Sequence, residues 1–162
     1  MKIEDILNNY NEDRLTREQA LFTSIFIIQN RIQNSGEKIQ KELSMKQWLL
    51  ITMVSVCQEP HTLSNIGRLM GCSRQNIKKL VTTLEEKGYV MIQEGSNNSV
   101  CVELTDKVEK YSKEIGKEQV KLLNLLFEEF NDEELKQLFN MLLKIYSGLN
   151  SIEKYVGEKN YE

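Results

Sequence analysis

The sequence predicts a mainly α-helical chain with one small β-hairpin. Three observations predict this fold class. A single proline, Pro60, occurs among 162 residues, so long helices can form on both sides of it. Apolar residues recur with helical spacing over most of the chain. Between residues 89 and 104 the spacing changes to the alternation typical of strands, on either side of a polar turn.

The composition is that of a folded globular protein. Apolar residues make up 40% and charged residues 28% of the chain, which is typical neither of disordered nor of membrane-embedded sequences. The acidic start, Met1–Asp5, does not resemble a secretion signal, so we expect a cytoplasmic protein. A net charge of −3 argues against a surface that coats nucleic acid, although it leaves room for a local basic patch.

A long helix and a strongly apolar helix are expected in the N-terminal part. Thr16-Arg17-Glu18-Gln19 has the spacing of a capping box, so the first helix should begin there and end near residues 35–36. Ser44 and Gln47 form a second capping box at the start of a strongly apolar helix, which should be the most buried one. Pro60 ends this helix, because the residue before a proline disfavours helical geometry.

Two short capped helices follow, joined by a turn of about three residues. Thr62 is the expected cap of the first, which ends at Gly71. Ser73 is the expected cap of the second, which runs to Lys87 and stops at Gly88. This is the layout of a helix-turn-helix, and the hairpin that follows it directly would form a wing.

The C-terminal part is predicted to form two further helices, one from Thr105 and one that begins at a cap near Asn131. The last helix has an apolar stripe with nearly heptad spacing, which requires a partner and predicts a homodimer. The dimerisation residues of this stripe are Leu135, Leu138, Leu142, Ile145, Leu149 and Ile152.

The helix that begins after Ser73 carries the candidate DNA-binding face. A core stripe of Ile77, Leu80, Val81 and Leu84 turns the opposite face outward, with side chains that read base edges in the major groove. Residues 62–87 contain five Lys or Arg and two acids, a local charge of five minus two, or +3, which favours phosphate contacts. The candidate DNA-binding residues are Arg68, Ser73, Arg74, Gln75, Asn76, Lys78, Lys79 and Thr82, with Ser96, Asn97 and Asn98 in the wing.

The run from Ser44 to Thr105 resembles the MarR family of winged helix-turn-helix transcriptional regulators. The matching stretches are Gln47-Trp48-Leu49-Leu50, Ile66-Gly67-Arg68-Leu69-Met70-Gly71, Ser73-Arg74-Gln75-Asn76-Ile77, Leu84-Glu85-Glu86-Lys87-Gly88-Tyr89-Val90 and Leu104-Thr105.

The resemblance implies a single MarR-like unit over residues 1–162, with a DNA-binding lobe at 44–105 and dimerisation helices at 1–36 and 106–162. It also implies a homodimer on double-stranded DNA, the Ser73 to Lys87 helix in the major groove, the wing near the minor groove, and a response to a small-molecule effector. We therefore expect a sequence-specific transcriptional regulator.

The wing departs from the family pattern. An Asp-x-Arg signature with further arginines is usual there, whereas this chain reads Glu94-Gly95-Ser96-Asn97-Asn98-Ser99 and has no Arg or Lys between Gly88 and Asp106. The wing therefore offers no arginine for a contact in the minor groove. This leaves a second reading, a winged-helix protein-interaction module with weak or lost DNA binding.

Catalysis, a cofactor and a metal site are not expected. The single histidine, His61, has no nucleophile or orienting partner in sequence, and three dispersed cysteines do not form a metal-ligand pattern. Cys72, beside the Ser73 cap, is the best candidate for a thiol-based redox-sensing regulator, the third reading. Against it, a free cysteine is most often a small buried side chain, and family members that sense peroxide generally use a cysteine in the first helix, which has none here.

Overall fold

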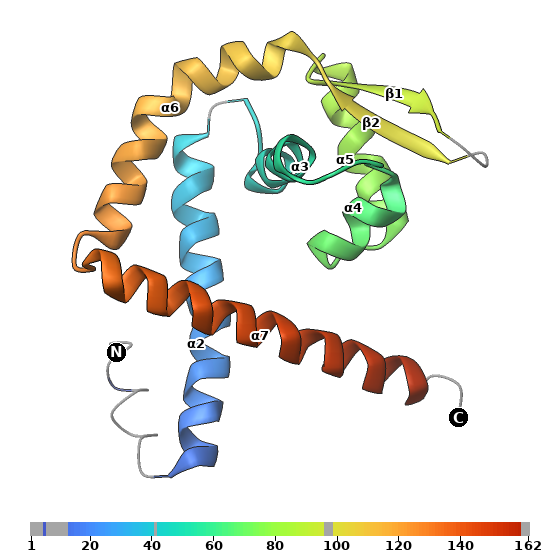
Figure 1. Ribbon diagram of the computed structural model, residues 1–162. Helices are drawn as coiled ribbons and strands as arrows, with labels where there is room; N and C mark the ends of the chain where they lie inside the picture. Colours follow the sequence, from blue (N-terminus) through green and yellow to red (C-terminus); the bar gives the residue numbers. More distant parts are fainter. Residues whose placement is uncertain (1–4, 6–12, 41, 96–98, 160–162) are drawn as a thin grey trace. The chain divides into compact units, whose positions relative to one another are not determined.

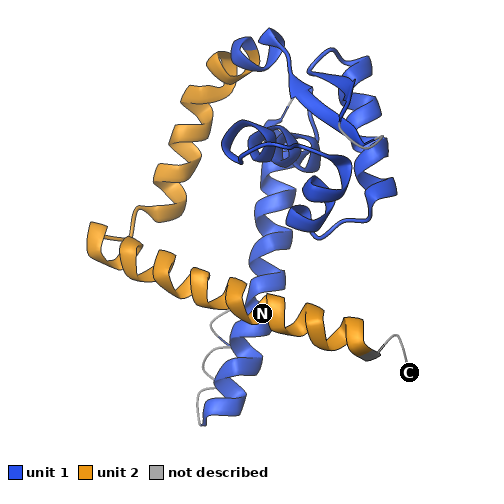
Figure 2. Ribbon diagram, turned by 45° about the vertical axis from the view of Figure 1, so that its right-hand side comes forward, with its two compact units in different colours: residues 1–110 blue, residues 111–162 orange. Residues whose placement is uncertain are grey.

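The computed structural model describes residues 5, 13–40, 42–95 and 99–159 (Figure 1). It confirms a mainly helical chain with one two-stranded hairpin. The elements are α2 (Arg14–Ile39), α3 (Met45–Val56), α4 (Leu63–Met70), α5 (Arg74–Glu86), β1 (Val90–Glu94), β2 (Val100–Leu104), α6 (Asp106–Phe127) and α7 (Asp132–Lys159). The chain forms two compact units, residues 1–110 and 111–162 (Figure 2). Within the described ranges, none of the helices combines the length and the apolar character that a membrane span requires.

The first helix begins earlier and ends later than predicted. The Asp13 carboxylate accepts from the Thr16 amide at 2.9 Å, and the Thr16 hydroxyl accepts from the Asp13 amide at 3.1 Å. Asp13 is therefore the cap, and Thr16 is the third helical residue. At the other end Gly36 stays within the helix, where the space that its missing side chain leaves is filled by Met45.

The helix-turn-helix is confirmed, with the predicted caps. The Thr62 hydroxyl accepts from the Asn65 amide at 3.1 Å, and the Ser73 hydroxyl accepts from the Asn76 amide at 3.2 Å. Gly71, with φ of 63°, ends α4 in the left-handed conformation that glycine adopts readily. These three residues fix where both helices begin and how the chain turns between them.

The hairpin pairs β1 with β2 in antiparallel register, from Val90 opposite Leu104 to Glu94 opposite Val100. The first strand begins at Val90, one residue after the predicted start of the hairpin, and the second ends at Leu104, as predicted. A further bridge between Thr62 and Cys101 adds a short third segment to β2. This segment was not predicted, because a bridge of one residue has no periodic pattern.

The core of this unit is formed where α3, α4 and α5 pack against the hairpin. Side chains at most 1% exposed are Leu50, Ile77, Val81, Leu84, Tyr89, Val90 and Val102. Leu80, expected on the inward stripe of α5, is only partly buried. Helix α3 is apolar but not uniformly covered, since Leu49 is 38% and Val56 is 70% exposed.

In the second unit, α7 begins at the predicted cap. The Asn131 side-chain oxygen accepts from the amides of Glu133 and Glu134, each at 3.0 Å, and Glu134 accepts in return from the Asn131 amide at 2.9 Å. The acids of this first turn also face the positive end of the helix dipole. The sequence therefore placed this helix start correctly.

Candidate nucleic-acid interface

Helix α5 presents a fixed polar face. Ile77, Val81 and Leu84 are 0% exposed, so the core holds this helix in one rotational setting. At 100° per residue, the residues between these anchors must point outward. The exposed residues of α5 are Arg74, Gln75, Asn76, Lys78, Lys79 and Thr82, followed by Glu85 and Glu86 in its last turn.

The two remaining candidates of the helix-turn-helix lie beside this face. Ser73 is exposed, and its hydroxyl oxygen is already engaged in capping α5. Arg68 is exposed on α4, and its guanidinium donates to the Asn65 side chain at 3.3 Å. Asn65 in turn donates to the Pro60 carbonyl at 2.9 Å, so Asn65 links the Arg68 guanidinium to the segment before α4. The eight candidates thus come together on α4, the turn and α5.

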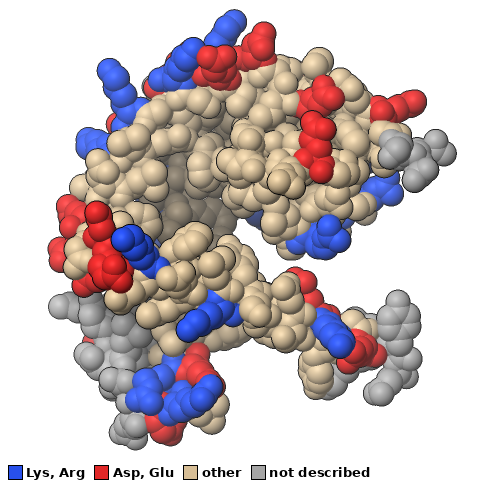
Figure 3. Space-filling model, in the orientation of Figure 1, with Lys and Arg blue, Asp and Glu red and all other residues tan. Residues whose placement is uncertain are grey.

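The charges of this lobe are unevenly distributed. Figure 3 shows Lys and Arg side chains at the edge of the lobe where α4 and α5 lie, and acidic side chains on the hairpin side. A helix that combines positive charge with amide and hydroxyl groups is suited to a polyanion whose base edges carry donors and acceptors.

Lys87 does not belong to this basic edge, although it contributes to the local excess of positive charge. Its ammonium donates to the Glu42 carbonyl and, at 3.3 Å, to the side-chain oxygen of Gln47. These partners are 45 and 40 residues away in sequence, so no local pattern predicted the contact. The basic residues left at the candidate interface are Arg68, Arg74, Lys78 and Lys79.

The described part of the wing is acidic. Glu94 and Glu103 are exposed, and Gln93 donates to the Glu103 carboxylate at 2.7 Å. At the base of the wing, the Ile92 amide donates to Glu85 at 3.0 Å, which attaches β1 to the end of α5. The predicted wing residues Ser96, Asn97 and Asn98 lie outside the described residues.

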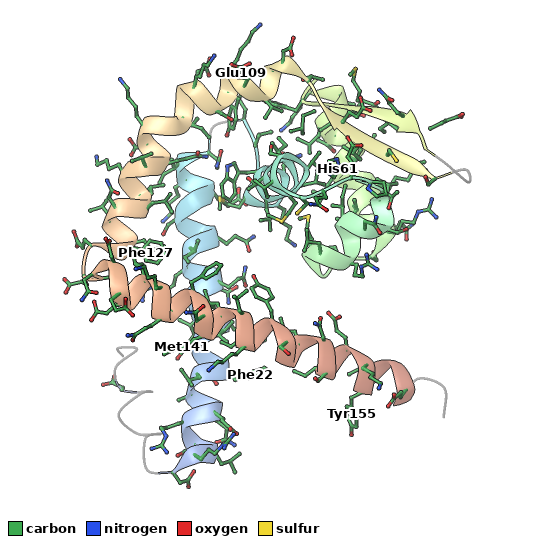
Figure 4. All side chains as sticks on the ribbon, viewed as in Figure 1. Phe22, His61, Glu109, Phe127, Met141 and Tyr155 are labelled. Carbon is green, nitrogen blue, oxygen red and sulfur yellow. The ribbon has the colours of Figure 1, made fainter. Side chains whose placement is uncertain are left out.

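The histidine and two of the cysteines lie in or beside the segments that flank α4. A ring nitrogen of His61 lies 2.9 Å from the Cys57 carbonyl, in the segment between α3 and α4 (Figure 4). Cys57, Cys72 and Cys101 are half-buried free thiols, and the Cys72 sulfur lies 3.5 Å from the Met70 carbonyl. The described residues contain no cluster of three side chains that could hold a metal ion. Redox sensing by Cys72 stays a prediction.

Comparison with known proteins finds a transcriptional repressor among the relatives of this chain. The transcriptional repressor MprA of Escherichia coli K12 is 24% identical over 149 residues, which cover 89% of this chain and 85% of MprA. No family model matches the chain.

Solved structures agree in fold. A MarR/EmrR family transcriptional regulator from Acinetobacter sp. ADP1 has a TM-score of 0.71 at 19% identity, over 83% of this chain and 97% of that one. The transcriptional regulator BldR from Sulfolobus solfataricus has a TM-score of 0.69 at 22% identity, and the match covers 82% of this chain and 98% of BldR. MepR of S. aureus, solved in a complex with DNA, has a TM-score of 0.63 at 17% identity, and the match covers 81% of this chain and 95% of MepR. These comparisons confirm the resemblance seen in the sequence: the chain has the winged helix-turn-helix fold of the MarR family of transcriptional regulators.

Proposed function

We propose that this chain is a MarR-family transcriptional regulator that binds double-stranded DNA sequence-specifically as a homodimer, and that it is not an enzyme. The observation that carries the proposal is the exposed face of α5, whose amide, hydroxyl and basic side chains are held outward by a fully buried stripe. MepR, which shares the fold, has been solved with DNA, and MprA is a repressor. Both support this reading.

The residues divide into two roles. Gln75 and Asn76 carry amides that can pair with adenine edges, so they are assigned to base reading. Arg68, Arg74 and Lys78 are assigned to phosphates, which set affinity without sequence information. Lys79 can take either role, because an ammonium group can bind a guanine edge or a phosphate. Ser73 and Thr82 supply hydroxyls at the two ends of this surface.

The dimer is assigned to the helices that flank the lobe. Residues 1–36 and 106–162 form the dimerisation part of one MarR-like unit, and residues 44–105 form the DNA-binding lobe. Apolar side chains are exposed along α2, α6 and α7, which favours burial against a second copy. A small-molecule effector belongs to the same proposal, by analogy with the family.

The test is a selection of DNA duplexes from a random library with the full-length protein, followed by Gln75→Ala. We expect a selected sequence with two-fold symmetry, because a symmetric dimer reads two equivalent half-sites. Removing one bidentate base interaction should weaken binding to this duplex by about 1 to 3 kcal/mol. A scrambled duplex should be bound almost as before.

Gln58→Ala is the matched control, since Gln58 is an exposed glutamine beyond α3 and far in sequence from α5. This variant should bind both duplexes as the wild type does. Equal losses on both duplexes for Gln75→Ala would show that Gln75 contacts only the DNA backbone.

The second candidate is a winged-helix protein-interaction module. The observation that favours it is the wing, whose described residues carry Glu94 and Glu103 and no basic side chain. If the full-length protein selects no sequence and binds random DNA only weakly, this candidate replaces the first.

A further inference from the structure

A polar cluster lies at the C-terminal end of α5, the helix that we call the recognition helix because it carries the candidate DNA-binding face. Its members come from three segments that are distant in sequence: the loop before α3 with the first turn of that helix, the end of α5 with the start of the hairpin, and the first turn of α6. We call it the junction cluster. It consists of Glu42, Gln47, Lys87, Tyr89 and Lys107, all within the unit of residues 1–110.

Glu42 stands at the centre of the junction cluster. Its carboxylate accepts from the hydroxyl of Tyr89, whose ring is buried with 1% exposed. The ammonium of Lys107 lies 3.7 Å from the same carboxylate oxygen and 4.4 Å from the centroid of the Tyr89 ring. Glu42 is therefore linked both to the start of the hairpin and to α6.

Backbone groups extend these links to α5 and α3. Lys107 donates to the Lys87 carbonyl at 3.1 Å, and Lys87 donates to the Glu42 carbonyl. Lys87 also reaches Gln47, which is 7% exposed and takes part in the capping box of α3. The C-terminal end of the recognition helix is thus connected to α3, to α6 and to the loop after α2.

The hydrogen bond from Tyr89 and the neighbouring ammonium groups favour the ionised form of Glu42. The hydrogen bond from Tyr89, together with the nearby ammonium groups of Lys107 and Lys87, holds the pKa of Glu42 below its ordinary value. Its carboxylate is consequently available to both partners at neutral pH.

We propose that Glu42 is a positioning residue, which sets the direction of α5 relative to the first turn of α6. The inference rests on the proposed function. Exposed ion pairs add only about 0 to 1 kcal/mol to folding stability, so thermodynamic stability alone gives little reason for this arrangement. Geometry gives a better one, because a dimer must present two recognition helices at a spacing of about 34 Å. If the DNA-binding lobe could tilt, the two recognition helices of the dimer would lie at a range of spacings.

The experiment measures how binding depends on the distance between half-sites. The full-length wild type first selects a two-fold symmetric duplex from a random library. Affinities are then measured for this duplex and for versions with one base pair added or removed between the half-sites. Each base pair shifts a half-site by about 3.4 Å and rotates it by roughly a tenth of a turn.

Glu42→Gln removes the charge of the carboxylate, and Tyr89→Phe removes the hydroxyl while the buried ring stays. We expect both variants to bind the selected duplex several-fold more weakly and to lose several-fold less affinity than the wild type when the spacing changes. The melting temperature should stay within a few degrees of the wild type, since a partly exposed interaction is removed.

Glu86→Gln is the control, because it makes the same change of charge at an exposed position on α5 itself. It should retain the spacing dependence of the wild type. If wild type and both variants show the same spacing dependence, the positioning role is overturned while the proposed function stands. If the wild type selects no duplex, the proposed function fails and the positioning role fails with it.

Discussion

At the scale of single residues, the helix-turn-helix depends on positions where a side chain has no room. Gly67 is buried within α4, and a Cβ atom added there would lie 2.7 Å from the carbonyl oxygen of Cys72. The Cys72 amide donates to the Gly67 carbonyl at 2.8 Å, so the turn folds back closely onto α4. Gly67 therefore sets the distance between α4 and the start of α5.

Replacing Gly67 with alanine should destabilise the protein by about 1 to 3 kcal/mol, because the rigid backbone of the turn must move away. Chemical denaturation of the full-length protein measures this. Gly116→Ala is the matched control, since Gly116 also lies in a helix but an added Cβ would have nothing within 4 Å. It should be neutral or stabilising by up to about 1 kcal/mol. Equal stability of the two variants would contradict the close approach.

At the scale of elements, the sequence predicted helix starts well where a cap and its partner are three residues apart. Ser44, Thr62, Ser73 and Asn131 all cap the helices expected of them. The prediction failed at α2, where Asp13 and Thr16 are both competent caps and the reciprocal pair forms at the earlier residue. Local capping patterns are therefore informative when one candidate stands alone.

The contacts between elements could not be predicted in the same way. The resemblance and the helical period predicted the outward face of α5, but the local charge count, which included Lys87, could not show where its ammonium group lies. Its actual partners, and the link between Glu42 and Tyr89, join residues 40 to 47 positions apart. Such pairs have no periodic signal in one sequence, because they depend on how the elements pack.

The wing should contribute little to DNA binding, because the side chains of its described residues are acidic or neutral. Replacing Asn97 and Asn98 together with alanine should change affinity by less than about 1 kcal/mol, since a hydrogen bond from a neutral amide to DNA replaces one to water and gains little net energy. Removing Lys78 or Lys79 should instead reduce the salt dependence of binding by about one unit of log-log slope for each phosphate that is no longer neutralised. Titrations of the selected duplex over a range of salt concentrations measure both. A larger effect of the asparagines than of the lysines would show that the wing reads DNA.

At the scale of the whole molecule, the main feature that a single chain does not explain is its exposed apolar surface. On α2, Phe22 (labelled in Figure 4) and Phe26 are 61% and 54% exposed. Their rings pack edge to face with centroids 5.0 Å apart. On α7, Leu142 and Leu149 are 43% and 44% exposed. Apolar side chains repeated along several helices are typical of surfaces that a second chain covers.

Leu142→Glu combined with Leu149→Glu should therefore shift the protein from dimer to monomer. Each charge would be buried in an apolar interface at a cost of several kcal/mol. Size-exclusion chromatography with light scattering at micromolar concentration distinguishes 18.9 kDa for one chain from twice that mass. Asn140→Glu with Asn150→Glu is the control, which adds the same charge to exposed polar positions of α7 and should leave the dimer intact.

Because operator affinity requires both half-sites to be held at once, the monomeric variant should also bind the selected duplex no better than a single half-site. A wild-type protein that is itself a well-behaved monomer would remove the basis for the symmetric operator as well as for the dimer.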